Sequence, residues 1–480
     1  MRAIIFVALL SGSCWAQPER HVVIVDLDGV RRDLLETTYR AGKMPQLERL
    51  FGKSASFSNA LYFEQATTIA PTVTMAGQAS LFTGSYPGVH GIPGNNWFDR
   101  AQAAVVDYMS YTGAACVYGF ALFGMTGCEG GRANQDLTTH TLYDSASAAG
   151  FTSVVVYNQY WKGATRVIEP SISDALALLQ GGDLNLELFD QNMTARAIAE
   201  MQQNGRPSIL TLYFAGADST GHAHGTGPLM DYLSQVIDPL LGTLFDALEA
   251  LDPGWRLNTL FIFSADHGRT DASAIPDDGL ALALMASTLA TAGFDADHAH
   301  IANEGGLAYI YLRPPGAFWS ESPAVVELKA AASALADDPS LATEIDSVCY
   351  RDRGYHCAGQ LGAAHERLLN ASNSARTGDL VILARPGRYF ANRSPEGAEH
   401  GALDDTDLAI PLILAGGGVL PGRISTPVSN VQIAATVAAY LGFPITGAEP
   451  ALPGVVHDWS RHRFPPPGRL QPPLSDQSIH

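Results

Sequence analysis

Three Asp and three His side chains of types that bind metals follow apolar runs of the chain. They are Asp28, Asp218, His222, Asp266, His267 and His400. Asp218 and His222 are four residues apart, the spacing that places two side chains on one face of a helix. This mixed oxygen and nitrogen set suits zinc, with manganese or iron as alternatives. Six ligands exceed what one catalytic zinc needs, so the sequence predicts two metal ions about 4 Å apart, an arrangement that serves phosphate displacement.

A hydroxyl that could act beside such metals lies in the stretch 67–99. Four threonines precede the run MAGQASLFTG, whose small residues predict a closely packed helix; they are Thr67, Thr68, Thr72 and Thr74. Free backbone N–H groups at a helix N-terminus favour an anion. Thr74 is best placed to act as nucleophile and metal ligand, with Asn95 holding a phosphate oxygen. The plainer alternative is that Thr72 or Thr74 only caps the helix.

Alternating strands and helices must position these residues. Apolar runs predict buried strands at 21–28, 152–157, 208–214, 257–264 and 409–415, and helical segments lie between them. This alternation predicts an α/β fold with a mostly parallel central sheet and helices on both faces. The acidic residues then lie at the carboxyl edge of the sheet, where such folds bind ligands. Two less regular stretches, about 101–133 and 271–398, are predicted insertions, the second an added lobe.

Composition limits the partners and the compartment. The 480 residues carry 29 Lys and Arg against 48 Asp and Glu, a net charge of −19, which argues against nucleic-acid binding. Residues 1–16 resemble a signal peptide ending at Ala16, too short to span a membrane, so we expect a periplasmic or secreted protein. Cys14 lacks a good lipoprotein context. No other apolar run reaches membrane length, and the Pro-rich stretch 464–480 is expected to be disordered.

Four cysteines follow the predicted signal peptide, in two pairs that are close in sequence. An even number in an exported protein favours disulfides, and we expect Cys116–Cys128 and Cys349–Cys357, each closing a short loop. A four-cysteine zinc site is the alternative, but the CxxC spacing typical of such sites is absent.

The order of motifs resembles a known family. Asp28-Gly29 after the first strand is followed by Thr74 before a small-residue helix, then YPGVHGI, DSTGH, ADHG and HG. Over residues 20–445 the chain is similar to the alkaline phosphatase superfamily, in the branch of type I phosphodiesterase/nucleotide pyrophosphatases and the related alkaline phosphatases with a Thr nucleophile. The resemblance implies a hydrolase of small phosphate esters or nucleotides with an alkaline phosphatase-like fold.

The resemblance also implies residue roles. Asp28, Asp266 and His267 would bind the zinc that activates Thr74, and Thr74 would form a covalent phosphorylated or nucleotidylated intermediate. The second zinc would be bound by Asp218, His222 and His400, and Asn95 would contact a phosphoryl oxygen.

Two departures leave the choice between diester and monoester open. Many phosphodiesterases of the branch have Lys-Thr-Phe-Pro-Asn around the nucleophile, whereas this chain has Val73-Thr74-Met75-Ala76-Gly77. Bacterial monoesterases carry a Lys and an Arg two positions apart that bind phosphate, and the nearest candidates here, Lys162 and Arg166, are four apart. A phosphodiesterase/nucleotide pyrophosphatase is the first expectation and an alkaline phosphatase-type monoesterase the alternative. The leaving group and the oligomeric state stay open.

Two other classes compete with this interpretation. The run DLDG resembles the haloacid dehalogenase motif, in which Asp26 would attack phosphate, Asp28 would act as acid and base, and magnesium would be the metal. Val30 stands where that motif has Thr, and the Thr-rich stretch, DSTGH and ADHG go unexplained. The second alternative is a pseudoenzyme that binds metal or nucleotide without turnover. A sulfatase would need Cys or Ser at position 74.

Overall fold

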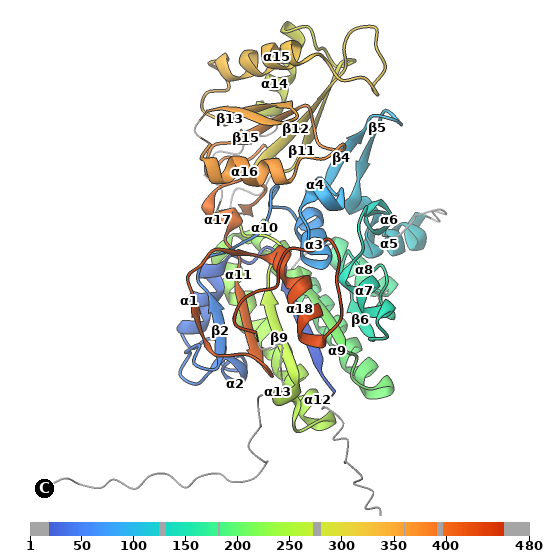
Figure 1. The fold of residues 1–480 in the computed structure, drawn as a ribbon, viewed down its shortest axis with the longest axis vertical. Coiled ribbons are helices and arrows are strands. Elements are labelled where there is room, and N and C mark those ends of the chain that lie inside the picture. The colour runs from blue at the N-terminus through green and yellow to red at the C-terminus, as the bar shows by residue number, and fades with distance from the viewer. Residues whose placement is uncertain are drawn as a thin grey trace, which may run out of the picture.

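The central domain is built on an eight-stranded sheet. The computed structural model describes residues 19–123, 131–180, 183–271, 280–359, 361–390 and 397–455. The strand order is β18-β2-β17-β9-β1-β8-β6-β7 (Figure 1). The bounds are β1 His21–Leu27, β2 Ala60–Phe63, β6 Ser153–Val156, β7 Arg166–Ile168, β8 Ile209–Phe214, β9 Thr259–Ser264, β17 Leu412–Gly416 and β18 Gly422–Ile424.

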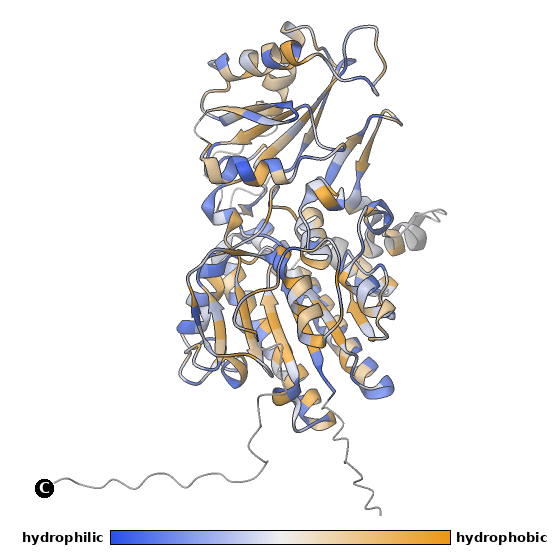
Figure 2. Cartoon of the chain, viewed as in Figure 1, coloured by the Kyte–Doolittle hydropathy of each residue, from blue (hydrophilic) through white to orange (hydrophobic). Residues whose placement is uncertain are grey.

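The pairing confirms a mostly parallel α/β sheet. The central strand β1 is parallel to both β8 and β9, and β6 is parallel to β8 and to β7. β17 runs antiparallel to β9 and β2. Strands β1, β8 and β9 are buried along their whole length, as expected for strands covered on both faces. The apolar composition of β9 is visible in Figure 2.

Helices cover both faces of this sheet. The first layer contains helices that pack on one another, α3 (Thr74–Thr83), α7 (Leu142–Ala148) and α18 (Ile433–Leu441). The second layer contains α9 (Asp183–Asn204) and α12 (Asp238–Leu251), with α9 lying against β6, β7 and β8. Other helices of the domain are α1 Arg32–Arg40, α2 Glu48–Phe51, α4 Pro87–His90, α10 Ala215–His224, α11 Thr226–Tyr232 and α13 Trp255–Asn258.

A separate lobe lies above the carboxyl edge of the central sheet (Figure 1). It contains a five-stranded antiparallel sheet in the order β11-β12-β15-β13-β14, with its own apolar core. The strands are β11 Ala299–Asn303, β12 Leu307–Leu312, β13 Ile345–Asp352, β14 Gly354–Gly359 and β15 Leu380–Ala384, and the helices are α14 Leu280–Thr291, α15 Val325–Asp337 and α16 Ala363–Ala371. An inserted lobe is therefore present within the predicted stretch 271–398.

The chain enters and leaves the lobe through one short stem. β10 (Thr270–Asp271) pairs antiparallel with β16 (Ala398–Glu399), so that Thr270 lies opposite Glu399. The stem joins two segments that are far apart in sequence, one following β9 and one preceding position 400. This pairing brings the ends of the insertion together at the carboxyl edge of the central sheet.

The earlier insertion also lies beside the sheet. The hairpin of β4 (Asn96–Asp99) and β5 (Ala104–Asp107) extends toward the lobe (Figure 1), and α5 (Gly113–Phe123) packs against α8 (Ile172–Gln180). The Cys349–Cys357 disulfide is confirmed, and it joins directly opposed residues of the β13–β14 hairpin rather than closing a loop. The other predicted disulfide, Cys116–Cys128, includes Cys128, which lies outside the described residues.

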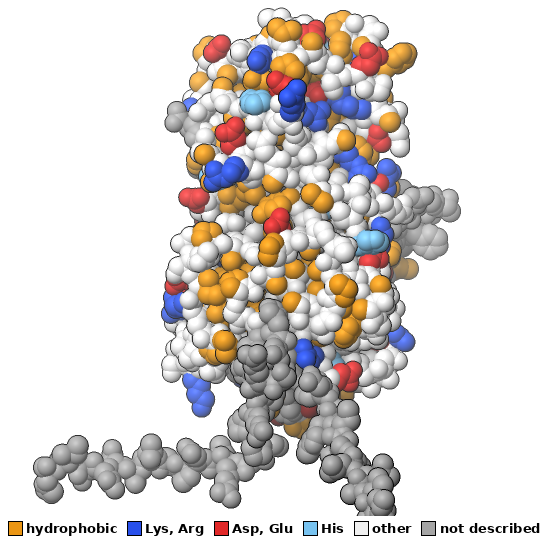
Figure 3. Space-filling view, viewed as in Figure 1, with side chains coloured by type: hydrophobic (Ala, Val, Ile, Leu, Met, Phe, Trp, Pro, Cys, Tyr) orange, Lys and Arg blue, Asp and Glu red, His pale blue; other side chains and the backbone are white. Residues whose placement is uncertain are grey.

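On the face shown in Figure 3, acidic and basic side chains are interspersed and no continuous basic stripe is present. None of the helices that the structure describes combines the length and apolar character needed to cross a membrane. The predicted signal peptide at 1–16, Cys14 and the Pro-rich stretch 464–480 all lie outside the described residues.

Candidate metal centre and nucleophile

Adjacent strands deliver the predicted ligands to one edge of the sheet. In the register of β1 and β9, Asp26 is level with Ser264, so Asp28 and Asp266 each follow two residues later. α10 begins directly after β8 and carries Asp218 in its first turn. The predicted spacing of Asp218 and His222 on one helix face is therefore present.

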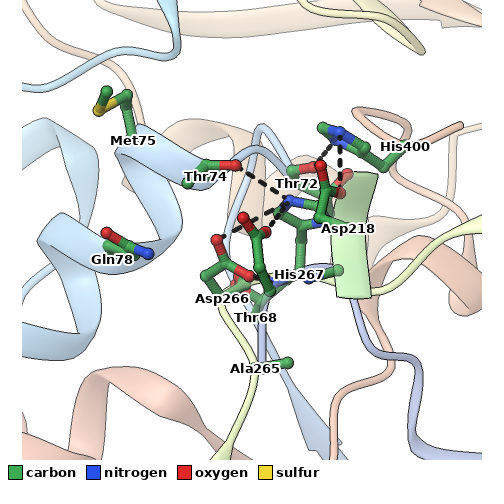
Figure 4. Close-up of polar contacts among 12 residues, drawn as sticks. Thr68, Thr72, Thr74, Met75, Gln78, Asp218, Ala265, Asp266, His267 and His400 are labelled. Carbon is green, nitrogen blue, oxygen red and sulfur yellow. Dashed lines mark hydrogen bonds and ion pairs between the residues drawn. The ribbon is translucent and has the colours of Figure 1, made fainter. Parts of the chain in front are cut away.

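The first cluster consists of Asp28, Asp266 and His267. Asp266 and His267 are labelled in Figure 4. His267 Nε2 lies 3.4 Å from Asp28 Oδ1 and 3.8 Å from Asp266 Oδ2. The other ring nitrogen, Nδ1, donates to the Gly268 carbonyl at 2.9 Å, so Nε2 keeps its lone pair. Asp28 Oδ1 and Asp266 Oδ2 are buried without a hydrogen-bond donor. Two orphaned carboxylate oxygens facing an imidazole lone pair are the donor set that a metal ion requires.

The second cluster consists of Asp218, His222 and His400. His222 Nε2 lies 3.3 Å from Asp218 Oδ2 and only 3.1 Å from His400 Nε2. His400 Nδ1 donates to the Thr72 carbonyl at 2.9 Å, and His222 Nδ1 faces a carboxylate oxygen of Glu399 at 3.3 Å. Burial opposes protonation of His222, but the Asp218 carboxylate outweighs it and raises the pKa of His222 to about 10. A proton on His222 Nε2 therefore links it to His400 Nε2, at the place that a bound cation would take.

The two clusters lie side by side. The rings of His267 and His400 are stacked with centroids 3.9 Å apart. The β10–β16 stem explains this proximity, because His267 precedes β10 by three residues and His400 directly follows β16. The six predicted ligands therefore form two adjacent groups, each chemically suited to one metal ion.

The pKa values of the carboxyl groups in both clusters are strongly perturbed. Burial raises the pKa of Asp266 well above its usual range, and the negative charges of Asp28 and Asp26 raise it further. Burial also opposes ionisation of Asp218, but His222 and Arg269 outweigh it and hold the pKa of Asp218 well below its usual range. A bound cation would stabilise all these carboxylates in their ionised form.

Thr74 lies at the start of α3, facing the first cluster. Its Oγ1 is 3.3 Å from His267 Nε2 (Figure 4). The helix approaches closely because Gly77 has no side chain: a Cβ there would lie 2.4 Å from the Asp266 carbonyl oxygen. The helix N-terminus also directs backbone N–H groups toward this region. A hydroxyl beside two metal clusters, at the positive end of a helix, is arranged for attack on an anionic ester.

Asn95 is held on the other side of the α3 N-terminus. Its Oδ1 accepts a hydrogen bond from Met75 N–H at 3.0 Å, which fixes the orientation of the amide. The Nδ2 group is then the amide donor left to contact a ligand. Asn95 is thus hydrogen-bonded to the first turn of the helix that begins at Thr74.

Sequence reasoning missed several residues that support the ligands. Arg269 is fully buried, donates to the Gly29 carbonyl at 2.9 Å and pairs with Asp218. The Tyr213 hydroxyl donates to Asp28 Oδ2. Arg269 directly follows the ADHG motif, so its place in the sequence could have indicated that it lies near the ligands. Tyr213 lies in the apolar strand β8, where nothing in the sequence indicates a contact with a ligand.

Arg166 does not reach the site. It pairs in register with Val154, which is level with Val23 through β8. Val23 precedes Asp28 by five residues, about 16 Å along an extended strand. The Arg166 guanidinium lies 3.2 Å from Glu200. Lys162 lies in the connection before β7, where its backbone N–H donates to Asn134 at 2.9 Å.

The haloacid dehalogenase alternative fails at its nucleophile. Asp26 is fully buried, and its Oδ2 accepts a 3.3 Å hydrogen bond from Asn158. Burial and the neighbouring charge of Asp28 raise the pKa of Asp26 well above its usual range. A fully buried carboxyl group cannot reach a phosphate ester, so Asp26 is excluded as the nucleophile.

Comparisons with known proteins agree with this arrangement. A family model described as type I phosphodiesterase / nucleotide pyrophosphatase matches residues 22–403, a range that contains every predicted site residue. The chain is 24% identical over 253 residues to ectonucleotide pyrophosphatase/phosphodiesterase family member 1 of Mus musculus, covering 52% of this chain and 24% of that protein. It is 30% identical over 168 residues to alkaline phosphatase PhoV of Synechococcus elongatus, covering 35% of this chain and 26% of that protein. The matches therefore span about a quarter of the length of these relatives.

Solved structures show the same fold. Murine ectonucleotide pyrophosphatase/phosphodiesterase 5 superposes with a TM-score of 0.62 at 17% identity, over 90% of this chain and 98% of that one. Wild-type alkaline phosphatase PafA superposes with a TM-score of 0.68 at 18% identity, over 92% of this chain and 99% of that one. This chain therefore shares its fold with both of these proteins.

Proposed function

The chain belongs to the type I phosphodiesterase / nucleotide pyrophosphatase family, and from that premise we propose that it is a two-zinc hydrolase of phosphate esters acting through Thr74. The observation that carries this proposal is the convergence of two metal-type clusters on one hydroxyl, with Thr74 Oγ1 at 3.3 Å from His267 Nε2. A structural or purely binding protein has no need for a hydroxyl placed in this way. The reaction class is displacement at phosphorus followed by hydrolysis.

The residues of the site divide into ligands and reacting groups. Asp28, Asp266 and His267 would hold one zinc ion. Asp218, His222 and His400 would hold the other. When bound, the two ions supply the positive charge that favours an ionised Thr74 hydroxyl and stabilises charge developing on the phosphate oxygens.

The chain's own groups then account for the chemistry. Thr74 Oγ attacks phosphorus, an Oγ–P bond forms, and the bond from phosphorus to the leaving oxygen breaks. The Asn95 Nδ2 group and the backbone N–H groups at the start of α3 donate to the non-bridging oxygens. Water then displaces Thr74 from phosphorus and regenerates the free hydroxyl. The Thr74 hydroxyl releases its proton to solvent as it attacks, and the leaving oxygen takes a proton from solvent.

We propose a phosphodiester or nucleotide pyrophosphate as the preferred substrate. A monoester carries an extra negative charge, which the resembling monoesterases bind with a Lys and an Arg. Here Arg166 pairs with Glu200 at the opposite end of its strand. The three buried residues that follow β6 at the site's edge of the sheet are the uncharged Tyr157, Asn158 and Gln159. A solved structure of inactive murine family member 5 in complex with AMP is consistent with nucleotide-type substrates for this fold.

Export is the proposed location. The predicted signal peptide at 1–16 and the Cys349–Cys357 disulfide both fit an oxidising compartment outside the cytoplasm. Periplasmic or secreted localisation can be tested by fractionation of cells that produce the full-length chain.

Paired kinetics test the proposed activity. Zinc-loaded protein is assayed with p-nitrophenyl phosphate, bis-p-nitrophenyl phosphate and the p-nitrophenyl ester of thymidine monophosphate. We expect kcat/KM for the diesters to exceed that for the monoester by about 100-fold or more, which corresponds to roughly 3 kcal/mol. The reverse preference would establish the monoesterase alternative. Turnover of neither class by protein that binds zinc would support the pseudoenzyme.

A further inference from the structure

A turn of the inserted lobe reaches into the catalytic edge of the central sheet. It joins β11 to β12 and contains Glu304, whose side chain is only 4% exposed. The Glu304 carboxylate accepts hydrogen bonds from two consecutive backbone N–H groups, Asn95 N–H to Oε2 at 2.7 Å and Asn96 N–H to Oε1 at 2.9 Å. Asn96 Nδ2 also donates to the Asn303 carbonyl at 2.8 Å. Both oxygens of one buried carboxylate are thus committed to the loop that carries Asn95.

The fit between the turn and this loop is close. A Cβ at Gly94 would lie 2.5 Å from Glu304 Cδ, so the loop packs directly on the carboxyl group. Burial raises the pKa of Glu304 to about 8, the Asn96 and Asn95 N–H donors oppose this shift, and the charge of Asp107 on β5 adds to it, so the carboxylate form prevails above that pH. A carboxylate is the side-chain group that can accept from both N–H groups at once, since an amide offers one oxygen and one donor.

Three of the four polar groups of Asn95 are hydrogen-bonded within the protein. Its N–H donates to Glu304, its carbonyl accepts from Tyr108 N–H at 2.9 Å, and its Oδ1 accepts from Met75 N–H at 3.0 Å. Among the described residues, Nδ2 is the polar group of Asn95 for which no partner is recorded. The side chain is half-buried, so this donor remains accessible to a ligand.

The same turn also contacts the backbone of the segment that carries His400, a member of the second cluster. Gly306 N–H donates to the His400 carbonyl at 3.0 Å. Gly401 lies so close to the turn that a Cβ there would be 1.8 Å from the Glu304 carbonyl oxygen. The turn therefore touches the segment of His400 and the loop of Asn95 together.

We propose that Glu304 is a positioning residue of the phosphate site, fixing the Asn95 backbone so that Asn95 Nδ2 meets a phosphoryl oxygen. This inference rests on the proposed function, which assigns the phosphate contact to Asn95. The lobe thereby contributes to binding of the anionic centre of the substrate, beyond any role in enclosing it.

A double-mutant cycle on Asn95 and Glu304 tests the coupling. Zinc-loaded wild type, Asn95→Ala, Glu304→Gln and the double variant are compared at about pH 9, where Glu304 is ionised. Their affinity for inorganic phosphate is measured by calorimetry, and kcat/KM is measured on a diester. Glu304→Gln places an amide NH2 group against a backbone N–H donor, so we expect phosphate affinity to fall about tenfold. In the Asn95→Ala background the same change should cost less than about twofold, because the donor that Glu304 positions is already gone.

Asp238→Asn provides a matched control. The Asp238 carboxylate also accepts from two consecutive backbone N–H groups, Gln46 and Leu47, both at 3.0 Å, on the α12 side of the sheet. We expect this variant to lower the melting temperature but to leave phosphate affinity and kcat/KM unchanged. Zinc content and melting temperature are measured for every variant.

Three results would overturn the inference. They are a Glu304→Gln protein with full phosphate affinity, a loss that is equal in both backgrounds, and an Asn95→Ala protein that binds phosphate normally. Failure of the proposed function would look different, since a protein without turnover would still report the coupling through phosphate binding. A non-additive loss of phosphate affinity would therefore support the role of Glu304 even in a pseudoenzyme.

Discussion

Glu399 should control the affinity of one metal and not of the other. Its side chain is 11% exposed, and Oε1 lies 3.3 Å from His222 Nδ1. With zinc bound, this contact would hold the proton on Nδ1 and leave Nε2, which faces Asp218 and His400, to bind the metal. Glu399→Gln keeps an oxygen acceptor but removes its charge, and Glu399→Ala removes the acceptor altogether.

The expected losses follow from the hydrogen bond that changes. A bond to a charged acceptor contributes about 1.5–3 kcal/mol and a neutral one about 0.5–1.5 kcal/mol. The Gln variant should therefore bind zinc roughly tenfold more weakly at this cluster. The Ala variant also frees the His222 ring to rotate, and we expect a loss near 100-fold, the upper end for outer ligands of metal sites.

Stepwise competition with a chromogenic chelator measures this effect. Asp28, Asp266 and His267 have no recorded contact with Glu399 among the described residues, so one zinc equivalent should weaken while the other stays unchanged. Glu327→Gln is the control, because Glu327 accepts from Ala324 N–H at the start of α15 in the lobe. Unchanged zinc affinity in folded Glu399→Ala protein, or equal weakening of both equivalents, would refute the reasoning.

Three further predictions concern the nucleophile, the excluded cation and a buried acid. Thr74→Ala should lose diester turnover by roughly 10³-fold or more while two equivalents of zinc still bind, as measured by kinetics and metal analysis; retained turnover would remove Thr74 from the chemistry. Arg166→Ala should leave kcat/KM for diester and monoester within about twofold, since the guanidinium pairs with Glu200 instead of the substrate. Burial raises the pKa of Asp190 from 3.8 to about 7. Between these values the folded protein keeps a proton that the unfolded chain releases, so stability falls as pH rises through the window. Asp190→Asn should flatten this fall in denaturant titrations at pH 5 and pH 8, and an unchanged slope would contradict the raised pKa.

The sequence alone was sufficient for the parts that are local. Apolar runs are long enough to identify β1, β8 and β9, because strands covered on both faces are continuously apolar. The four-residue spacing of Asp218 and His222 fixed their common helix face, and small residues before Gly84 identified α3. Residue type and chain order predicted that these positions meet, and the resemblance to the family predicted the two clusters into which they fall.

Tertiary structure decided everything that depends on pairing between distant segments. The stacking of His267 on His400 follows from the β10–β16 stem, which joins positions more than a hundred residues apart and has no periodic signal in the sequence. Arg166 was a plausible phosphate ligand by spacing, and only the strand register placed it at the opposite end of the sheet.

Glu304 shows the same limit most clearly. Nothing in the residues around it indicates that its carboxylate meets the backbone of Asn95, because that contact joins the lobe to a loop more than two hundred positions earlier. The sequence determined which chemistry this protein carries, since ligand types and helix spacing are local properties. The fold decided which buried groups orient that chemistry, since long-range hydrogen bonds exist only after the lobe and the sheet have come together.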